Sequence, residues 1–335
     1  MSRKQPNNVK FGLYVPNFGK SSDPLTLAEI AVDAERSGWD GIFLWDHLVE
    51  WDKRLPICDS LTVLAAIAVK TKRIRIGTTL SPLPRYKPWD LARRTVTLDH
   101  LSNGRLILSV GLGAAESCDY ARFGEEADNA VLAEKLDESL KIITGLWSGK
   151  KFSFHGKHFR LGPSVFLPTP KQQPRIPIWV GGFWPREGPF KRAARWDGVL
   201  PLRLPEKLPQ PQDLREIVEF IQKHRHVSRP FDVVNIGWTT GNKKKDSDKL
   251  ERYAESGMTW WLESLFTKRD SPGAMRSLVQ RGPPRFASRY YSEETKGYSG
   301  LKRPSLFRTS RACSVIHLLG FPASSTCNAF SVPHP

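Results

Sequence analysis

The amino-acid sequence predicts an α/β protein built as a (β/α)₈ TIM barrel, with an insertion after the fourth helix and a C-terminal tail outside the barrel. Short apolar runs of strand length alternate with stretches of helical periodicity along most of the chain. With 335 residues, 39% of them hydrophobic and 25% charged, the chain can bury a large core. A doubly wound open sheet is the alternative fold, but it needs fewer strand–helix units than the sequence supplies.

The first half of the chain predicts four strand–helix units. Leu27, Ile30 and Ala34 recur at helical spacing, and Gly38 follows them where a helix commonly ends. Ser60 is expected to cap the second helix. The strands are expected at residues 9–15, 41–45, 74–80 and 106–110, and the helices at residues 25–37, 60–70, 90–101 and 130–147.

The alternation breaks at residues 149–174 and then resumes. In this insertion two short apolar runs flank His155-Gly156-Lys157 and predict a hairpin. The later strands are expected at residues 178–180, 198–200, 231–238 and 258–262, and the helices at residues 189–195, 211–224, 246–256 and 272–280. Eight such units imply a parallel sheet that closes on itself.

The last segment of the chain lacks this pattern. We expect the barrel domain to span residues 1–285, and residues 286–335 to form a tail that is poorly ordered or appended. A shifted reading frame or a lost stop signal would produce the same kind of tail.

Composition limits the partners and the compartment. The formal net charge of +17 suggests nucleic acid, but the basic residues are scattered, so we expect no nucleic-acid partner. Lys243-Lys244-Lys245 is expected to lie in a solvated polar loop. No apolar run approaches the roughly 18 residues needed to span a bilayer, and residues 1–10 lack an apolar signal core, so we expect a cytoplasmic protein without a membrane anchor. Reduced thiols are expected at Cys58, Cys118, Cys313 and Cys327.

Aromatic side chains and a histidine follow the second strand, which ends in Trp45-Asp46-His47, with Trp51 close behind. Functional side chains in such barrels lie where strands end. His47 is therefore a candidate catalytic proton donor or hydrogen-bond anchor. Trp45, Trp51 and Trp238 are candidates for the apolar wall of a substrate site. A structural histidine beside packing aromatic residues is the alternative.

The third strand ends in small and hydroxyl residues, which let a flat ring approach the backbone. Thr79 and Leu80 are therefore candidate cofactor-binding residues. Arg85, in the following loop, is a candidate partner for a phosphate or an acidic substrate.

Glycines follow the fourth and fifth strands. Gly111, Leu112 and Gly113 are candidate cofactor contacts, but a dinucleotide fingerprint needs a third glycine where Glu116 stands, which excludes a nicotinamide Rossmann site. Glu116 is either a catalytic carboxylate or a helix-initiating charge. Backbone N–H groups after Gly181 and Gly182 form a natural phosphate nest, with a plain turn as the alternative. We expect no metal site, because no cluster of ligands has the required spacing.

In their order along the chain, these segments resemble the luciferase-like monooxygenase family. The second strand with its Asp46-His47 end, and Thr97-Leu98-Asp99-His100-Leu101-Ser102-Asn103-Gly104-Arg105-Leu106 before the Gly111 turn, are the most recognisable parts. Residues 176–182, 196–201 and 257–263 are similar to later strands of the family. The likeness covers about residues 9–285.

The resemblance implies an oxidoreductase that uses reduced FMN or the deazaflavin F420, by hydride transfer or by monooxygenation of a small organic substrate. It also implies that the insertion covers the active site, and that a homodimer is common. His47 and Trp51 match a pair that flanks the deazaflavin ring in some F420 enzymes, Leu80 matches the bulge behind the ring, and Gly181-Gly182 matches the phosphate loop. We favour F420 slightly, because of that pair and because a basic surface suits a polyglutamyl tail.

Two features limit this interpretation. Certain F420 dehydrogenases carry an acid directly after the Gly-x-Gly turn, and this sequence has Ala114 there, which weakens a sugar-phosphate dehydrogenase assignment. The unusual tail also leaves open a non-catalytic flavin-binding or degenerate barrel.

Overall fold

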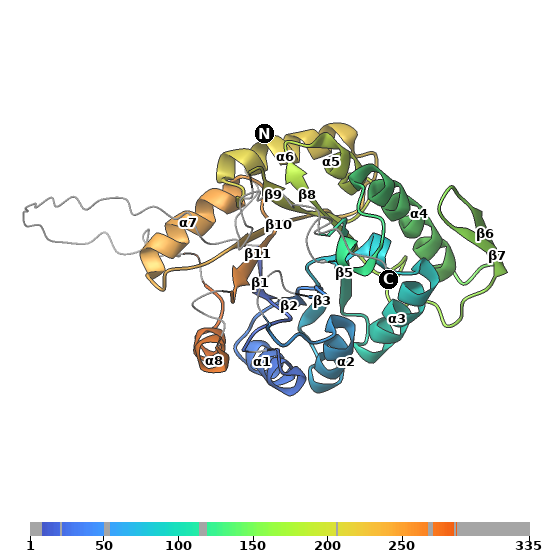
Figure 1. Cartoon of the computed structure of the whole chain (residues 1–335). Helices are drawn as coiled ribbons and strands as arrows, with labels where there is room; N and C mark the ends of the chain where they lie inside the picture. The colour runs from blue at the N-terminus through green and yellow to red at the C-terminus, as the bar shows by residue number, and fades with distance from the viewer. Residues whose placement is uncertain are drawn as a thin grey trace, which may run out of the picture.

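The computed structural model describes residues 9–20, 22–49, 54–113, 119–205, 207–266, 271–284 and 286. Figure 1 shows strands at the centre of a ring of helices. The barrel strands are β1 (Lys10–Val15), β2 (Gly41–Leu44), β3 (Arg75–Thr78), β4 (Ser81–Pro82), β5 (Leu106–Gly111), β8 (Ile178–Trp184), β9 (Gly198–Arg203), β10 (Asp232–Gly237) and β11 (Trp260–Ser264). The helices are α1 (Pro24–Arg36), α2 (Ser60–Lys70), α3 (Pro88–Leu101), α4 (Asn129–Trp147), α5 (Glu187–Ala193), α6 (Pro211–His224), α7 (Lys243–Glu255) and α8 (Pro272–Gln280).

The strands form one closed parallel sheet, which confirms the predicted barrel. Their order is β3-β2-β1-β11-β10-β9-β8-β5-β4, and a further pairing of β3 with β5 closes the ring. The two-residue strand β4 follows β3 after a short interruption and pairs with the end of β5. Because all these strands run in parallel, their carboxyl ends meet at one end of the barrel, called the mouth below.

Aromatic rings fill the interior of the barrel. Phe43 packs at 5.0 Å from Trp179 and at 5.6 Å from Trp260, measured between ring centroids. Inward-facing glycines make room for these rings: a Cβ on Gly41 would lie 2.6 Å from the Phe43 ring, and a Cβ on Gly198 would lie 2.4 Å from the Trp179 ring. The interior is therefore a packed core rather than a channel.

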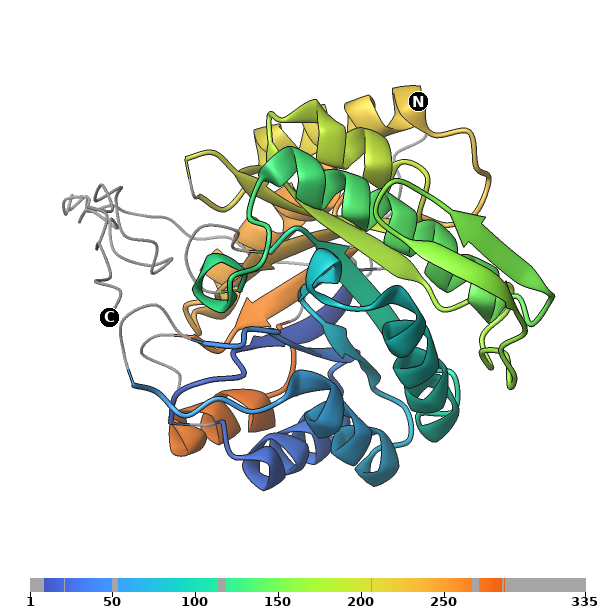
Figure 2. The same cartoon turned by 45° about the vertical axis from the view of Figure 1, so that its right-hand side comes forward.

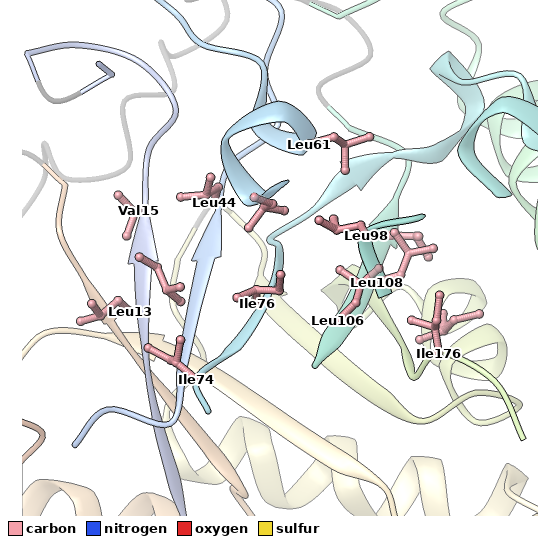
Figure 3. Packing of buried hydrophobic residues seen from close by; sticks show 14 of the residues in the cluster. Leu13, Val15, Leu44, Leu61, Ile74, Ile76, Leu98, Leu106, Leu108 and Ile176 are labelled. Atoms are coloured by element: carbon pink, nitrogen blue, oxygen red, sulfur yellow. The ribbon is translucent and has the colours of Figure 1, made fainter. Parts of the chain in front are cut away.

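A second apolar layer joins the sheet to the helices. Outward-facing strand residues such as Leu13, Leu44 and Ile76 are buried here, and Figure 3 shows them packed with Leu61 of α2 and Leu98 of α3. Burying such side chains stabilises the fold by about 1.5–3 kcal/mol each.

Helix ends follow local side-chain chemistry. Gly38 adopts a φ of 90° after α1, as its predicted role as a helix terminator requires. The N-cap of α2 is Asp59, one residue before the predicted Ser60. Asp59 accepts the backbone N–H of Thr62, while the Ser60 hydroxyl donates to the carbonyl of Trp45. The predicted loop at Lys243-Lys244-Lys245 is also wrong. These exposed lysines form the first turn of α7, which the Asn242 side chain caps by accepting the N–H of Lys245.

The insertion forms the predicted hairpin, β6 (Phe152–His155) and β7 (Arg160–Ser164), but it does not cover the mouth. Its turn is anchored on α4, where the Glu138 carboxylate accepts the N–H groups of residues 157, 158 and 159. Arg93 of α3 donates to the carbonyl of Leu167, which holds the following segment. These contacts place the hairpin on the outer side of the helices, as Figures 1 and 2 both show, so the expected cover was wrong.

Within the described ranges, no helix has the combination of length and apolar character needed to cross a membrane.

Candidate active site

Leu80 brings three neighbouring positions of the barrel together at the mouth. It lies between β3 and β4, next to a cis peptide bond that joins it to Thr79. A Cβ on Gly111 of β5 would lie 2.8 Å from Leu80 Cδ2, and a Cβ on Gly181 of β8 would lie 2.3 Å from the same atom. Leu80 therefore packs directly on both glycines, and a side chain at either position would have to displace the Leu80 side chain.

An aromatic cluster occupies the neighbouring part of the mouth. The Trp45 ring lies 5.0 Å from Tyr14, 5.4 Å from Phe18 and 5.6 Å from His47. Trp45 is 8% exposed, and its indole N–H has no hydrogen-bond partner among the described residues. Burial raises the pKa of the Tyr14 hydroxyl, so that group stays protonated and can donate a hydrogen bond.

A buried network of charges lies beside this cluster. Arg85 donates to Asp119 Oδ1 at 2.9 Å and to Asp46 Oδ1 at 3.0 Å. The second oxygen of Asp46 accepts the hydroxyls of Ser81 and Tyr86, each at 2.7 Å. One guanidinium thus links the end of β2 to the loop after β5, with both carboxylates held in charge-assisted hydrogen bonds.

His47 joins this network through Asp119. Its Nδ1 lies 3.3 Å from Asp119 Oδ2, and the side chain of Asp119 has no exposed surface. Burial alone would raise the pKa of Asp119, but the hydrogen bond with His47 and the charges of His47 and Arg85 outweigh it, so that pKa is lowered. The mouth therefore holds a histidine against an ionised carboxylate.

Several site predictions need correction. Arg85 is not available to a phosphate, because its side chain is 7% exposed and both terminal nitrogens of its guanidinium are bonded to carboxylates. The strand predicted at residues 178–180 is longer than expected: β8 continues to Trp184, and Gly181 and Gly182 pair with Leu200 and Pro201 of β9. The glycine pair thus lies within a strand rather than in a loop. It pairs with β9 on one side only, because the pairing of β8 with β5 ends at Val180.

The remaining predicted residues divide into three groups. The Gly-x-Gly turn is tightly packed: Gly113 has a φ of 81°, a Cβ there would lie 2.6 Å from Pro82, and the carbonyl of Leu112 accepts the Tyr120 hydroxyl. Trp238 lies at the end of β10, where the ammonium of Lys249 on α7 is 5.7 Å from its ring. The predicted residues Trp51 and Glu116 lie outside the described residues, as does Ala114.

The structure adds residues that the sequence analysis missed. Tyr14 could have been found, because alternation along its strand places it on the same inward face as Gly12. Asp119 carries no such signal, since 72 residues separate it from His47. Thr79, in contrast, was among the predicted cofactor contacts; its Oγ1 is buried and has no hydrogen-bond partner in the described part of the chain. The same part of the chain contains no group of three or more side chains suited to a metal ion.

These features define a parallel barrel with a polar and aromatic site at the carboxyl ends of its strands. The chain belongs to the luciferase-like monooxygenase family, whose model matches residues 9–234. It is 32% identical over 190 residues to the F420-dependent glucose-6-phosphate dehydrogenase of Nakamurella multipartita, a match that covers 54% of this chain and 52% of that protein. The chain thus spans about half the length of the curated relatives it matches.

Solved structures support the fold. The coenzyme F420-dependent tetrahydromethanopterin reductase of Methanopyrus kandleri superposes with a TM-score of 0.65 at 17% identity, over 84% of this chain and all of that one (100%). The oxygenating constituent of 3,6-diketocamphane monooxygenase from Pseudomonas putida, solved with FMN, gives a TM-score of 0.63 at 17% identity, over 82% and 96% of the two chains.

Proposed function

We propose that this protein is an oxidoreductase that binds F420 or reduced FMN at the mouth and acts on a small organic substrate. The observation that carries the proposal is the convergence of His47, Leu80, Gly111 and Gly181 at one end of the barrel. Bound there, F420 would exchange a hydride with the substrate, whereas reduced FMN would activate dioxygen.

The residues at the mouth fit a flat, polar ring. The indole N–H of Trp45 and the hydroxyl of Thr79 are buried and have no hydrogen-bond partner among the described residues, so both can donate to a bound group. Leu80 offers an apolar surface at the back of the mouth, and the rings of Trp45 and Tyr14 offer aromatic surface at its side. We assign the ring to this space, with the backbone at Gly111 and Gly181 close beside it.

His47 is the group best suited to handle a proton. With Nδ1 held 3.3 Å from Asp119 Oδ2, the imidazole can take the proton of a substrate hydroxyl or return it. Tyr14 can donate a hydrogen bond to a substrate oxygen. The aromatic cluster around them limits the access of water, which strengthens both interactions.

F420 is the favoured cofactor. The relatives at 30–35% identity are named as F420-dependent enzymes, whereas the monooxygenase structure with FMN is 17% identical. A sugar phosphate is not the favoured substrate, because Ala114 stands where certain F420 dehydrogenases carry an acid and Arg85 is already paired. A small alcohol or carbonyl compound suits the aromatic mouth better.

Parallel titrations with F420 and FMN test this proposal. We expect F420 to bind more tightly, and Leu80→Ala to weaken binding by about tenfold, because the lost apolar contact is worth on the order of 1.4 kcal/mol. Leu101→Ala is the matched control, since Leu101 is 45% exposed at the end of α3. A wild-type protein that binds neither cofactor would instead support a non-catalytic barrel.

Two further properties are proposed from the family alone. These are a homodimeric state, which sedimentation measurements test, and a cytoplasmic location, which fractionation of the source cells tests.

A further inference from the structure

We infer that Asp119 is a positioning residue that fixes the tautomer and the orientation of His47. The inference rests on the proposed function, in which His47 handles a proton at the mouth. Asp119 lies after β5 and contacts both His47, at the end of β2, and Arg85.

The contacts of Asp119 fix both of its oxygens. Oδ1 accepts Arg85 Nη1 at 2.9 Å and the N–H of Leu48 at 3.3 Å, and Oδ2 faces His47 Nδ1 at 3.3 Å. An ionised carboxylate can only accept hydrogen bonds, so Nδ1 must carry the proton in this pair. In the neutral imidazole, Nε2 is then the basic nitrogen.

The rest of the histidine is held as well. The side chain of Asn17 donates to the carbonyl of His47 and accepts its N–H, which fixes the backbone. The rings of Trp45 and Phe18 lie 5.6 Å and 6.1 Å from the imidazole. With backbone and ring face fixed, the carboxylate 3.3 Å from Nδ1 favours the tautomer that carries its proton on that nitrogen.

The surrounding charges keep that carboxylate ionised. Arg85 stands between Asp119 and Asp46, and the hydroxyls of Tyr86 and Ser81 satisfy Asp46 from the other side. Arg85 therefore holds Asp119 and Asp46 at the same time, and its positive charge favours the ionised form of Asp119.

Asp119→Asn separates a positioning role from a merely structural one. The amide oxygen can still accept from Arg85 and Leu48, so the loop stays anchored. The amide nitrogen then faces Nδ1 as a donor, which requires the opposite tautomer of His47. Asp99→Asn is the matched control, because Asp99 is equally buried but accepts from the backbone of Lys171 and Gln172, far from the histidine.

The test is nitrogen-15 NMR of histidine-labelled full-length protein without cofactor, at a pH where His47 is neutral, with its signals assigned through His47→Gln. In the wild type and in Asp99→Asn we expect the Nδ1–H form to exceed the Nε2–H form by about tenfold or more, because a hydrogen bond to a charged acceptor contributes that much. In Asp119→Asn the ratio should invert, and Asp119→Glu should restore it in part.

A wild-type His47 protonated on Nε2 overturns the inference, even if no Asp119 variant folds. An unchanged tautomer in folded Asp119→Asn overturns it as well. The NMR measurement needs no cofactor, so failure of F420 and FMN to bind would count against the proposed function and leave the tautomer result intact.

Discussion

Arg85→Met is the substitution for which the structure predicts the largest loss of stability at the mouth. Arg85 and both of its carboxylate partners are buried, with side-chain exposures of 7% for Arg85, 4% for Asp46 and 0% for Asp119. Methionine fills much of the same volume but removes the positive charge. Two buried carboxylates would then face each other across an apolar side chain.

The magnitude follows from which bonds survive. Asp46 keeps the hydroxyls of Ser81 and Tyr86, and Asp119 keeps His47 and the N–H of Leu48. Removing one partner of a buried ion pair typically costs about 3–5 kcal/mol. We expect a loss within this range, which at its lower end corresponds to a fall in Tm of roughly 6–12 °C.

Urea unfolding followed by circular dichroism at several pH values measures this loss. The lowered pKa of Asp119 means that its contribution to stability is present above its unfolded pKa and is lost as the pH falls through the folded pKa. The difference in the free energy of unfolding between wild type and Arg85→Met should therefore be largest at neutral pH and should become smaller below about pH 4. Arg195→Met is the control: Arg195 is 58% exposed and pairs with Asp137, which Arg192 also holds.

The free energy of unfolding of the control Arg195→Met should lie within about 1 kcal/mol of the wild-type value, as expected of an exposed ion pair. If Arg85→Met is as stable as Arg195→Met at neutral pH, the buried network contributes no net stability and the reasoning fails. A difference that grows rather than shrinks in acid would contradict the sign of the linkage.

Two further predictions concern the barrel and its boundary. Gly77→Ala should lower the free energy of unfolding by about 1–3 kcal/mol, because a Cβ there would lie 2.2 Å from the Ile107 carbonyl oxygen. Gly162→Ala is the control, because the space around Gly162 is open. It should change the free energy of unfolding by less than about 0.5 kcal/mol in the same urea assay. Phe286→Ala should lower the Tm, because the Phe286 ring packs 5.9 Å from that of Phe11 on β1. A chain that ends after Phe286 should have the same Tm as the wild type. If Phe286→Ala also has the wild-type Tm, Phe286 contributes nothing to the stability of the barrel.

The sequence pattern predicted the type of almost every element, because most helices bury one apolar face and the barrel strands are short apolar runs such as β2 and β5, which are buried on both faces. The ends were less predictable, because they depend on partners elsewhere in the chain. β8 continues past Gly182 since β9 supplies hydrogen bonds as far as Arg203. Three lysines at a helix start oppose the helix dipole, so the sequence offers little sign that Asn242 would begin a helix there.

The candidate site was predictable only where a residue stands at a strand end. His47, Leu80, Gly111 and Gly181 were identified in this way. The electrostatic network was not, because its members come from three separate loops. Arg85 looked like a ligand for an external anion, and the internal anions Asp46 and Asp119 that occupy it become apparent only when the loops meet.

The packing of the interior also limits where any ligand can lie. Phe43, Trp179 and Trp260 fill the barrel axis, and Tyr14 and Leu80 pack against this cluster. In the proposed function, a planar cofactor would therefore lie on the mouth-facing side of Leu80. One face of the ring would then meet the apolar barrel, and the other would meet the loop that carries His47. The burial of Arg85 and Asp119 strengthens the contact of Asp119 with both Arg85 and His47, because little water screens these charges.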